Sequence, residues 1–263
     1  MRILLLNPNT TTAMTERMSA AAEAVTAVGT TIVPVTATRG LPYIASRAEA
    51  QIGGAIALEM LAEHHQTVDA AIIAAFGDPG LLGARELFDI PVVGMAEAAM
   101  LGACMLGRRF AIVTFARALG PWYEDCVAAN GLAGRCAGIR MLDSPFQQVS
   151  DVQEEKEGLL VELALRAVNE DGADVVILAG APLAGLAAKV ADRISVPVVD
   201  QVAAAVKLAE ALVALRPRKA TAGTFRRPPA KPAIGLPEAL AGRIAHTDGP
   251  SSIRPDRRGL QRD

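Results

Sequence analysis

The chain has 263 residues and a formal net charge of −2, with 51% hydrophobic and 21% charged residues. This balance allows a large buried core and argues against a mainly disordered chain. The three cysteines form no CxxC or CxxH pattern, and no apolar run reaches 18 residues, so neither a disulfide scaffold nor a membrane span is expected. We expect a cytoplasmic protein with reduced thiols.

Short apolar runs that end in turn residues predict buried parallel strands, with helices between them. Strands are expected near 2–6, 31–35, 68–76 and 91–95, and again near 109–115, 137–142, 174–179 and 196–199. Helices are expected near 13–27, 47–66, 79–88 and 97–107, and near 118–130, 153–171, 182–192 and 201–215. Thr12 is expected to cap the first helix, and Asp78 with Pro79 to begin the third. The alternation indicates an α/β fold with parallel sheets.

The two sets of four strands form an internal repeat. Matching pairs, at an offset of 105 and then 106 residues, are Asp69 and Asp174, Ala75 and Gly180, Gly80 and Gly185, Leu81 and Leu186, and Pro91 and Pro197. The repeat predicts two similar lobes with parallel four-stranded sheets, related by a pseudo-two-fold axis. We expect residues 1–97 with 200–215 to form the first lobe and residues 98–199 to form the second.

Residues 216–263 differ in composition from the rest of the chain. They carry 11 Lys and Arg against 4 Asp and Glu, and 7 of the 16 prolines. Aromatic residues are not interleaved with these charges, apart from Phe225. We interpret the segment as a solvated, partly disordered basic tail, with a polyanion contact as the alternative, and expect no nucleic-acid partner.

Ligands in open parallel sheets bind beyond the carboxyl ends of the strands. The duplicated turns at 75–80 and 180–185 lie there, and their backbone N–H groups could hold an anion or a developing oxyanion. Alternatively, their small residues only let helices pack on strand ends. The candidate substrate-binding residues are Asn7, Asn9, Thr10, Ala75, Phe76, Gly77, Thr114, Gly180, Ala181 and Pro182.

Two residues are candidates for catalysis. Asp78 is the carboxylate of the first duplicated turn, and Tyr43 could supply a phenol; helix capping and packing are the respective alternatives. The three histidines, His64, His65 and His246, assemble no zinc site and no triad. No strand is followed by a GxGxxG run, and no lysine indicates a Schiff base. We therefore expect a reaction on a small molecule that needs no metal or cofactor.

Several segments together resemble one family: RILLLNPNTT, AFGDPGL with AREL, PVVGMAEAAM, RFAIVT and LAGAPLAGLA. They are similar to the aspartate/glutamate/hydantoin racemase superfamily, most of all to its hydantoin (allantoin) racemase branch, over about residues 1–215. The resemblance implies two Rossmann-like lobes with the active site between them. It also implies cofactor-independent racemisation at a carbon beside a carbonyl, in a homo-oligomer.

The resemblance further implies one catalytic cysteine on each side of the substrate. The matching positions here are Ala75 and Gly180, so both thiols are replaced. A racemase of a hydantoin-type or other amino-acid derivative is the leading interpretation. A lyase or hydrolase of a small carboxylate or cyclic amide on the same scaffold, and a non-catalytic small-molecule binder, are the alternatives.

Overall fold

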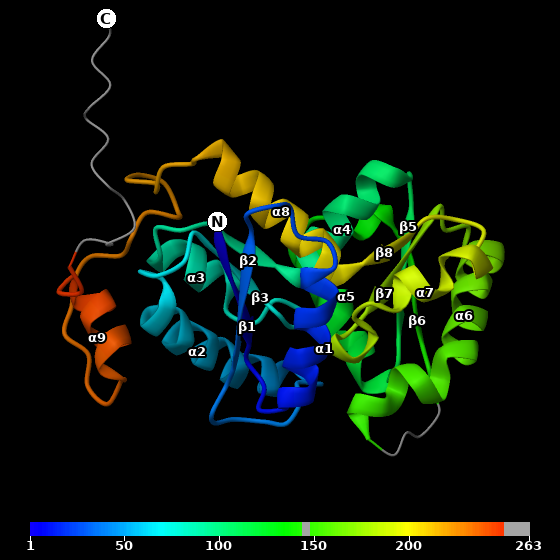
Figure 1. Cartoon of the computed structure of the whole chain (residues 1–263), viewed down its shortest axis with the longest axis horizontal. Helices are drawn as coiled ribbons and strands as arrows, with labels where there is room; N and C mark the ends of the chain where they lie inside the picture. Colours follow the sequence, from blue (N-terminus) through cyan, green and yellow to red (C-terminus); the bar gives the residue numbers. More distant parts are fainter. Residues whose placement is uncertain (144–147, 250–263) are drawn as a thin grey trace, which may run out of the picture.

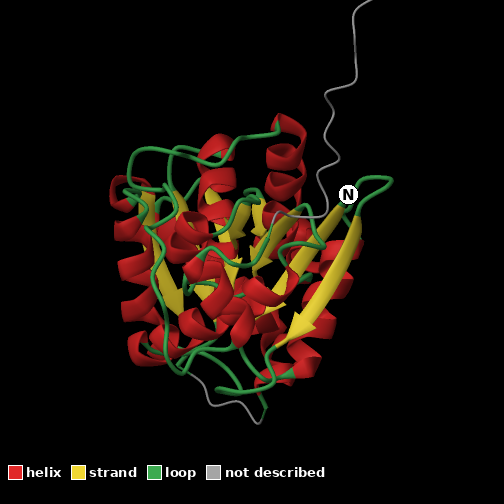
Figure 2. Ribbon diagram, turned by 90° about the vertical axis from the view of Figure 1, so that its left-hand side faces the viewer, coloured by secondary structure: helices red, strands yellow, loops and turns green. Residues whose placement is uncertain are grey.

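Two parallel four-stranded sheets, each covered by helices on both faces, form the computed structural model of the chain (Figure 1, Figure 2). The structure describes residues 1–143 and 148–249. In spatial order the first sheet contains β2 (Thr31–Thr36), β1 (Arg2–Asn7), β3 (Ala70–Ile73) and β4 (Val92–Gly94). The second contains β6 (Cys136–Met141), β5 (Phe110–Thr114), β7 (Val175–Ala179) and β8 (Val198–Asp200). The predicted α/β fold of two similar lobes is confirmed.

The helices follow the same duplication. Those of the first half are α1 (Thr12–Glu23), α2 (Arg47–His64), α3 (Leu81–Leu87) and α4 (Met95–Leu106). Those of the second half are α5 (Gly120–Ala129), α6 (Val152–Asp171), α7 (Leu186–Val190) and α8 (Gln201–Leu215), and the chain continues into α9 (Glu238–Ala245). All residues of β3, β5 and β7 are buried, and so is every residue of β1 after Arg2. Because helices cover both faces of these strands, their sequences are apolar without alternation.

The repeat extends to single backbone angles. Gly80 has φ +81° and its partner Gly185 has φ +80°, both in the left-handed region that favours glycine. A Cβ on Gly80 would also lie 2.8 Å from the carbonyl oxygen of Gly54 in α2. The two turns therefore need glycine to bring each following helix onto its sheet.

Helices α4 and α8 join the two halves. They pack against each other, while α4 also contacts β7 and β8 and α8 also contacts β3 and β4. Figure 1 shows α8 beside α4 in the middle of the molecule. Each of these two helices therefore contacts strands of both sheets and connects the two lobes. The lobe limits, residues 1–97 with 200–215 and residues 98–199, remain a proposal.

Two predicted helix starts are wrong. Helix α1 begins at Thr12, and its capping residue is Thr11, whose side chain makes no capping hydrogen bond; the helix ends at Glu23 rather than near residue 27. Helix α3 begins at Leu81 after Gly80, so Asp78 and Pro79 precede it. The turn Gly77–Gly80 uses the residues that were expected to form the first helical turn.

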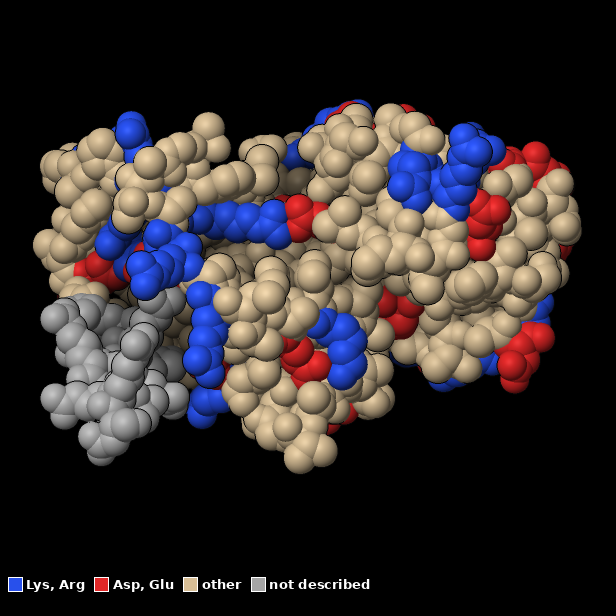
Figure 3. Space-filling model, turned by 90° about the horizontal axis from the view of Figure 1, so that it is seen from above, with Lys and Arg blue, Asp and Glu red and all other residues tan. Residues whose placement is uncertain are grey.

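Part of the basic tail is folded. Helix α9 packs on α2, and Arg243 within it is 2% exposed, paired with Asp248 at 2.8 Å and with Asp89 at 2.9 Å. Seen from above, basic side chains gather over the end of the molecule where this segment lies (Figure 3). The remainder of the tail prediction, residues 250–263, lies outside the described residues. No helix in the described part of the chain is long and apolar enough to cross a membrane.

Candidate functional site

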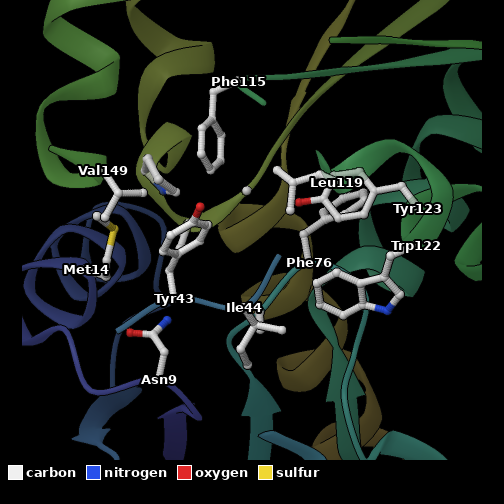
Figure 4. Close-up of a pocket in the computed structure, with 14 residues that line it drawn as sticks. Asn9, Met14, Tyr43, Ile44, Phe76, Phe115, Leu119, Trp122, Tyr123 and Val149 are labelled. Atoms are coloured by element: carbon white, nitrogen blue, oxygen red, sulfur yellow. The ribbon is translucent and has the colours of Figure 1, made fainter. Parts of the chain in front are cut away.

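A narrow pocket receives residues from both halves of the chain. The space inside it that a water-sized molecule can reach is about 30 Å³. The residues that line it are Asn9, Met14, Tyr43, Ile44, Ala75 and Phe76 from the first half, and Phe115, Leu119, Trp122, Tyr123, Val149, Gly180, Ala181 and Pro182 from the second (Figure 4). Both duplicated turns thus contribute to one pocket. None of these residues is charged, so the described wall offers no counter-charge to an ion.

Asn9 is fixed at the pocket by the turn that follows β1. Its Oδ1 accepts hydrogen bonds from Asn7 Nδ2 at 3.1 Å and from the Thr11 N–H at 3.0 Å. Asn7 is fully buried, and its Nδ2 also donates to Thr15 Oγ1 at 2.9 Å. Because its side-chain carbonyl already accepts these two bonds, Asn9 can contact a ligand through its amide Nδ2, which is a donor.

Tyr43 is positioned by the loop between β2 and α2. The Thr10 N–H donates to the Leu41 carbonyl at 2.9 Å, and Thr11 Oγ1 donates to the Pro42 carbonyl at 2.6 Å. These two bonds tie the loop to the turn after β1. The Tyr43 ring therefore lies over the pocket from the first lobe, with its hydroxyl directed inward (Figure 4).

Asp78 lies behind the pocket wall. It has φ +52°, and its carboxylate accepts from the N–H groups of Ala96 and Glu97, each at 2.8 Å, at the start of α4. It therefore caps α4, 18 residues further along the chain, instead of α3. Burial outweighs these two bonds and raises the pKa of Asp78 to about 7.

Glu97, the other carboxylate near this turn, is paired with Arg85 and does not line the pocket. Arg85 also donates through Nε to the Val92 carbonyl at 2.9 Å. This bidentate pair ties the end of α3 to the start of α4. Both acidic groups close to the first turn are thus already paired, Asp78 with the backbone of α4 and Glu97 with Arg85.

The backbone groups of the second turn, at 180–185, also have hydrogen-bond partners within the chain. The Gln201 side chain accepts from the Gly180 N–H at 2.9 Å and donates to the Gly180 carbonyl. Asp200 accepts from the Gly185 N–H at 2.6 Å and from the N–H groups of Val202 and Ala203 at 2.9 and 3.0 Å. The N–H groups of Gly180 and Gly185 are therefore occupied, and recognition at this turn depends on neighbouring side chains.

Aromatic side chains fill the second-lobe side of the pocket. Phe115 follows β5 directly, and Trp122 and Tyr123 lie in the first turns of α5. The Phe76 and Tyr123 ring centroids are 4.7 Å apart, so the aromatic wall continues across the two halves of the chain. A Cβ on Gly77 would overlap the Trp122 ring, which requires glycine at that position.

Gly180 is constrained by the same wall. It has φ +112°, and a Cβ placed on it would lie 2.6 Å from Phe115 Cε1 and 3.6 Å from the Tyr123 hydroxyl. Phe115 and Tyr123 therefore occupy the space that any side chain at position 180 would need.

The structure places the predicted site residues in two groups. Those that line the pocket are Asn9, Tyr43, Ala75, Phe76, Gly180, Ala181 and Pro182; those in the layer behind or beside it are Asn7, Thr10, Gly77, Asp78 and Thr114. The sequence prediction missed Phe115, Trp122 and Tyr123. A signal was present, because the chain has only one Trp, two Tyr and six Phe, and five of these nine aromatic residues line this pocket.

None of the three cysteines lines the pocket. Cys126 is buried in α5, and burial raises the pKa of its thiol; Cys104 and Cys136 are half-buried elsewhere. Among the described residues, no group of three or more His, Cys, Asp or Glu side chains could hold a metal ion.

The fold and the pocket define a two-lobed α/β protein whose duplicated turns meet at one uncharged, aromatic site. The chain belongs to the Asp/Glu/hydantoin racemase family, whose model matches residues 3–209. It is 35% identical to the hydantoin racemase of Paenarthrobacter aurescens over 233 residues, which is 88% of this chain and 99% of that protein.

Two solved structures of allantoin racemases are similar throughout. The one from Klebsiella pneumoniae has a TM-score of 0.86 and 38% identity, over 91% of this chain and 98% of its own. The one from Pseudomonas fluorescens has a TM-score of 0.82 and 35% identity, over 89% of this chain and 100% of its own. This relationship supports a racemase-type function.

Proposed function

We propose that the chain is a cofactor-independent racemase of a hydantoin-type or similar amino-acid derivative, which it binds in the pocket between the lobes. The observation that carries the proposal is the origin of the pocket wall: Ala75 and Phe76 of the first turn and Gly180 to Pro182 of the second face one space. Groups from two lobes can then approach one carbon from opposite sides, which is what inversion of that carbon requires.

The proposed reaction moves one proton from one face of the carbon to the other. The C–H bond beside the carbonyl breaks, its electron pair forms an enolate, and a proton then adds to the opposite face. No oxidant or co-reactant is needed, since the proton lost is replaced. We propose that the Tyr43 hydroxyl is the acid–base group on the first-lobe side and that a water molecule is the acid–base group on the other side. One accepts the proton that the carbon loses, the other supplies the proton that it gains, and exchange with solvent restores both.

Asp78 has a different role in this proposal. A pKa of about 7 suits an acid–base group, but both carboxylate oxygens are bonded to the backbone of α4 and the residue does not line the pocket. We propose that it positions the turn that carries Ala75 and Phe76.

The absence of charged residues from the described pocket wall favours a neutral ligand. A free carboxylate would lose its hydration in a pocket whose described lining has no cation, at a cost that hydrogen bonds alone do not offset. An uncharged ring such as a 5-substituted hydantoin avoids this cost, and an aromatic substituent would stack on Phe76, Phe115 or Trp122. Because the pocket is narrow, these side chains must move apart to admit a ring.

The test is hydrogen exchange at C5 of a panel of hydantoins in deuterated buffer, followed by proton NMR, with thermal shift as a parallel measure of binding. An Ala181→Phe variant, which fills the pocket, is the control. We expect exchange above the buffer blank with the natural chain and none with the variant. Binding without exchange would instead establish a non-catalytic binder. If the chain shows no binding and no exchange, the proposed ligand class is wrong.

The homo-oligomeric state and the cytoplasmic location expected from the sequence belong to this proposal. Sedimentation and cell fractionation would test them.

A further inference from the structure

Tyr123 presents its hydroxyl to the pocket from the second lobe. The residue is 2% exposed, and its ring is held between Phe76, at a centroid distance of 4.7 Å, and Trp122, at 5.8 Å. Figure 4 shows its hydroxyl directed into the pocket from the side opposite Tyr43. The two tyrosines of the chain thus face one space from different lobes.

The neighbours of the Tyr123 hydroxyl limit which groups can donate a proton to it. Thr114 Oγ1 lies 2.9 Å from the Ala179 carbonyl oxygen, which can only accept, so the single hydroxyl proton of Thr114 is committed there. Thr114 therefore has no proton left to donate to the Tyr123 oxygen with which it interacts. The Tyr123 oxygen, which is directed into the pocket, keeps its lone pairs for a donor on the ligand (Figure 4).

Gly180 makes this oxygen accessible. The Tyr123 hydroxyl is 3.6 Å from the position that a Cβ on Gly180 would occupy, so any side chain there would stand against it. Burial also raises the pKa of the Tyr123 phenol, which therefore stays neutral. Glycine at position 180 and tyrosine at position 123 are complementary.

We propose that Tyr123 is a specificity-determining residue that accepts a hydrogen bond from a ring N–H of the ligand. The ligand class is then narrowed to neutral cyclic amides and ureides with an N–H at the edge that faces the second lobe. Rings that carry oxygen or a methylated nitrogen at that edge leave the buried phenol oxygen without a donor. This inference rests on the ligand class of the proposed function, which it makes more specific.

The first experiment measures the affinity of 5-benzylhydantoin and of its 1-methyl and 3-methyl derivatives by calorimetry. A lost hydrogen bond of this kind weakens binding by about tenfold. We expect one N-methyl isomer to bind the natural chain about tenfold more weakly than the other, and Tyr123→Phe to bind both with similar affinity. Tyr43→Phe is the matched control, in which the difference between the isomers should persist. An isomer difference that survives Tyr123→Phe overturns the inference.

The second experiment needs no Tyr123 substitution in the protein that binds the ligand. Because the chain has two tyrosines, labelling with 3-fluorotyrosine gives one ¹⁹F resonance for each, assigned with the two Phe variants. We expect 5-benzylhydantoin to shift both resonances. C5–H exchange with an unshifted Tyr123 resonance would overturn this inference and leave the proposed function standing, whereas the absence of any binding would overturn both.

Discussion

Replacing Gly180 by alanine tests the packing that distinguishes this site. The added Cβ would lie 2.6 Å from Phe115 Cε1 and 3.2 Å from Phe115 Cδ1, both shorter than any ordinary carbon contact. The backbone angle φ of +112° adds strain of its own for a residue with a side chain. We therefore expect Gly180→Ala to destabilise the fold through two separable effects.

Alanine at a positive φ costs about 1 kcal/mol, and overpacking a buried site costs about 1–3 kcal/mol, which together reduce the free energy of unfolding by roughly 2–4 kcal/mol. Gly29→Ala is the control, because Gly29 has φ +84° but no atom within 4 Å of the Cβ position. It should lose only the part due to φ, about 1 kcal/mol.

Urea unfolding followed by fluorescence measures both variants, and Trp122, the only tryptophan, reports from the pocket wall itself. A double-mutant cycle with Phe115→Leu should recover at least about 1 kcal/mol of the Gly180→Ala loss, because the ring that obstructs the Cβ is gone. Equal losses for Gly180→Ala and Gly29→Ala, with an additive cycle, would refute the packing argument. The same reasoning predicts that a cysteine at position 180 fits only if Phe115 is also reduced in size.

Two further predictions concern buried charge. The pKa of Asp78 is about 7 in the folded chain against an ordinary value of 3.8, so its contribution to stability is complete below about pH 4 and is lost as pH rises to about 7. Between pH 5 and pH 8 the natural chain should lose about 3 kcal/mol that Asp78→Asn does not lose. Arg243→Met should leave Asp248 and Asp89 without their buried partner and weaken the docking of α9 by about 3 kcal/mol, which limited proteolysis would detect. Arg166→Met, which breaks an exposed pair, should change stability by less than about 1 kcal/mol.

Urea titrations of the natural chain and of Asp78→Asn at pH 5 and at pH 8 test the Asp78 prediction. Parallel pH profiles for the natural chain and Asp78→Asn would show that Asp78 ionises normally in the fold. For the second, an α9 that resists trypsin as well in Arg243→Met as in the control would show that the arginine is not what holds the segment.

The internal repeat made the fold predictable. Two copies of one strand–turn–helix pattern imply two equivalent sheets, and the shared φ of Gly80 and Gly185 shows how closely the copies agree. What the repeat could not reveal is which helix Asp78 caps. A carboxylate before a helical segment normally caps that segment, and only the folded chain brings it to Ala96 and Glu97 of a later helix.

The site was predictable only in part for a similar reason. Ala75, Phe76 and Gly180 to Pro182 could be predicted because ligands in parallel sheets bind at strand ends, and all of them line the pocket. Trp122 and Tyr123 were missed because they lie in a helix, where aromatic residues usually serve the core. Their approach to the first-lobe turn depends on how the two lobes pack, and no local pattern encodes that.

Proton exchange at C5 of 5-benzylhydantoin is the most direct test of the central claim, that two lobes without thiols in the pocket still promote inversion at one carbon. In deuterated buffer the natural chain should exchange this proton and racemise a single enantiomer at matching rates, both faster than buffer alone, with Tyr43→Phe reduced at least about tenfold. Bound ligand that keeps its C5 proton and its handedness throughout would contradict the account.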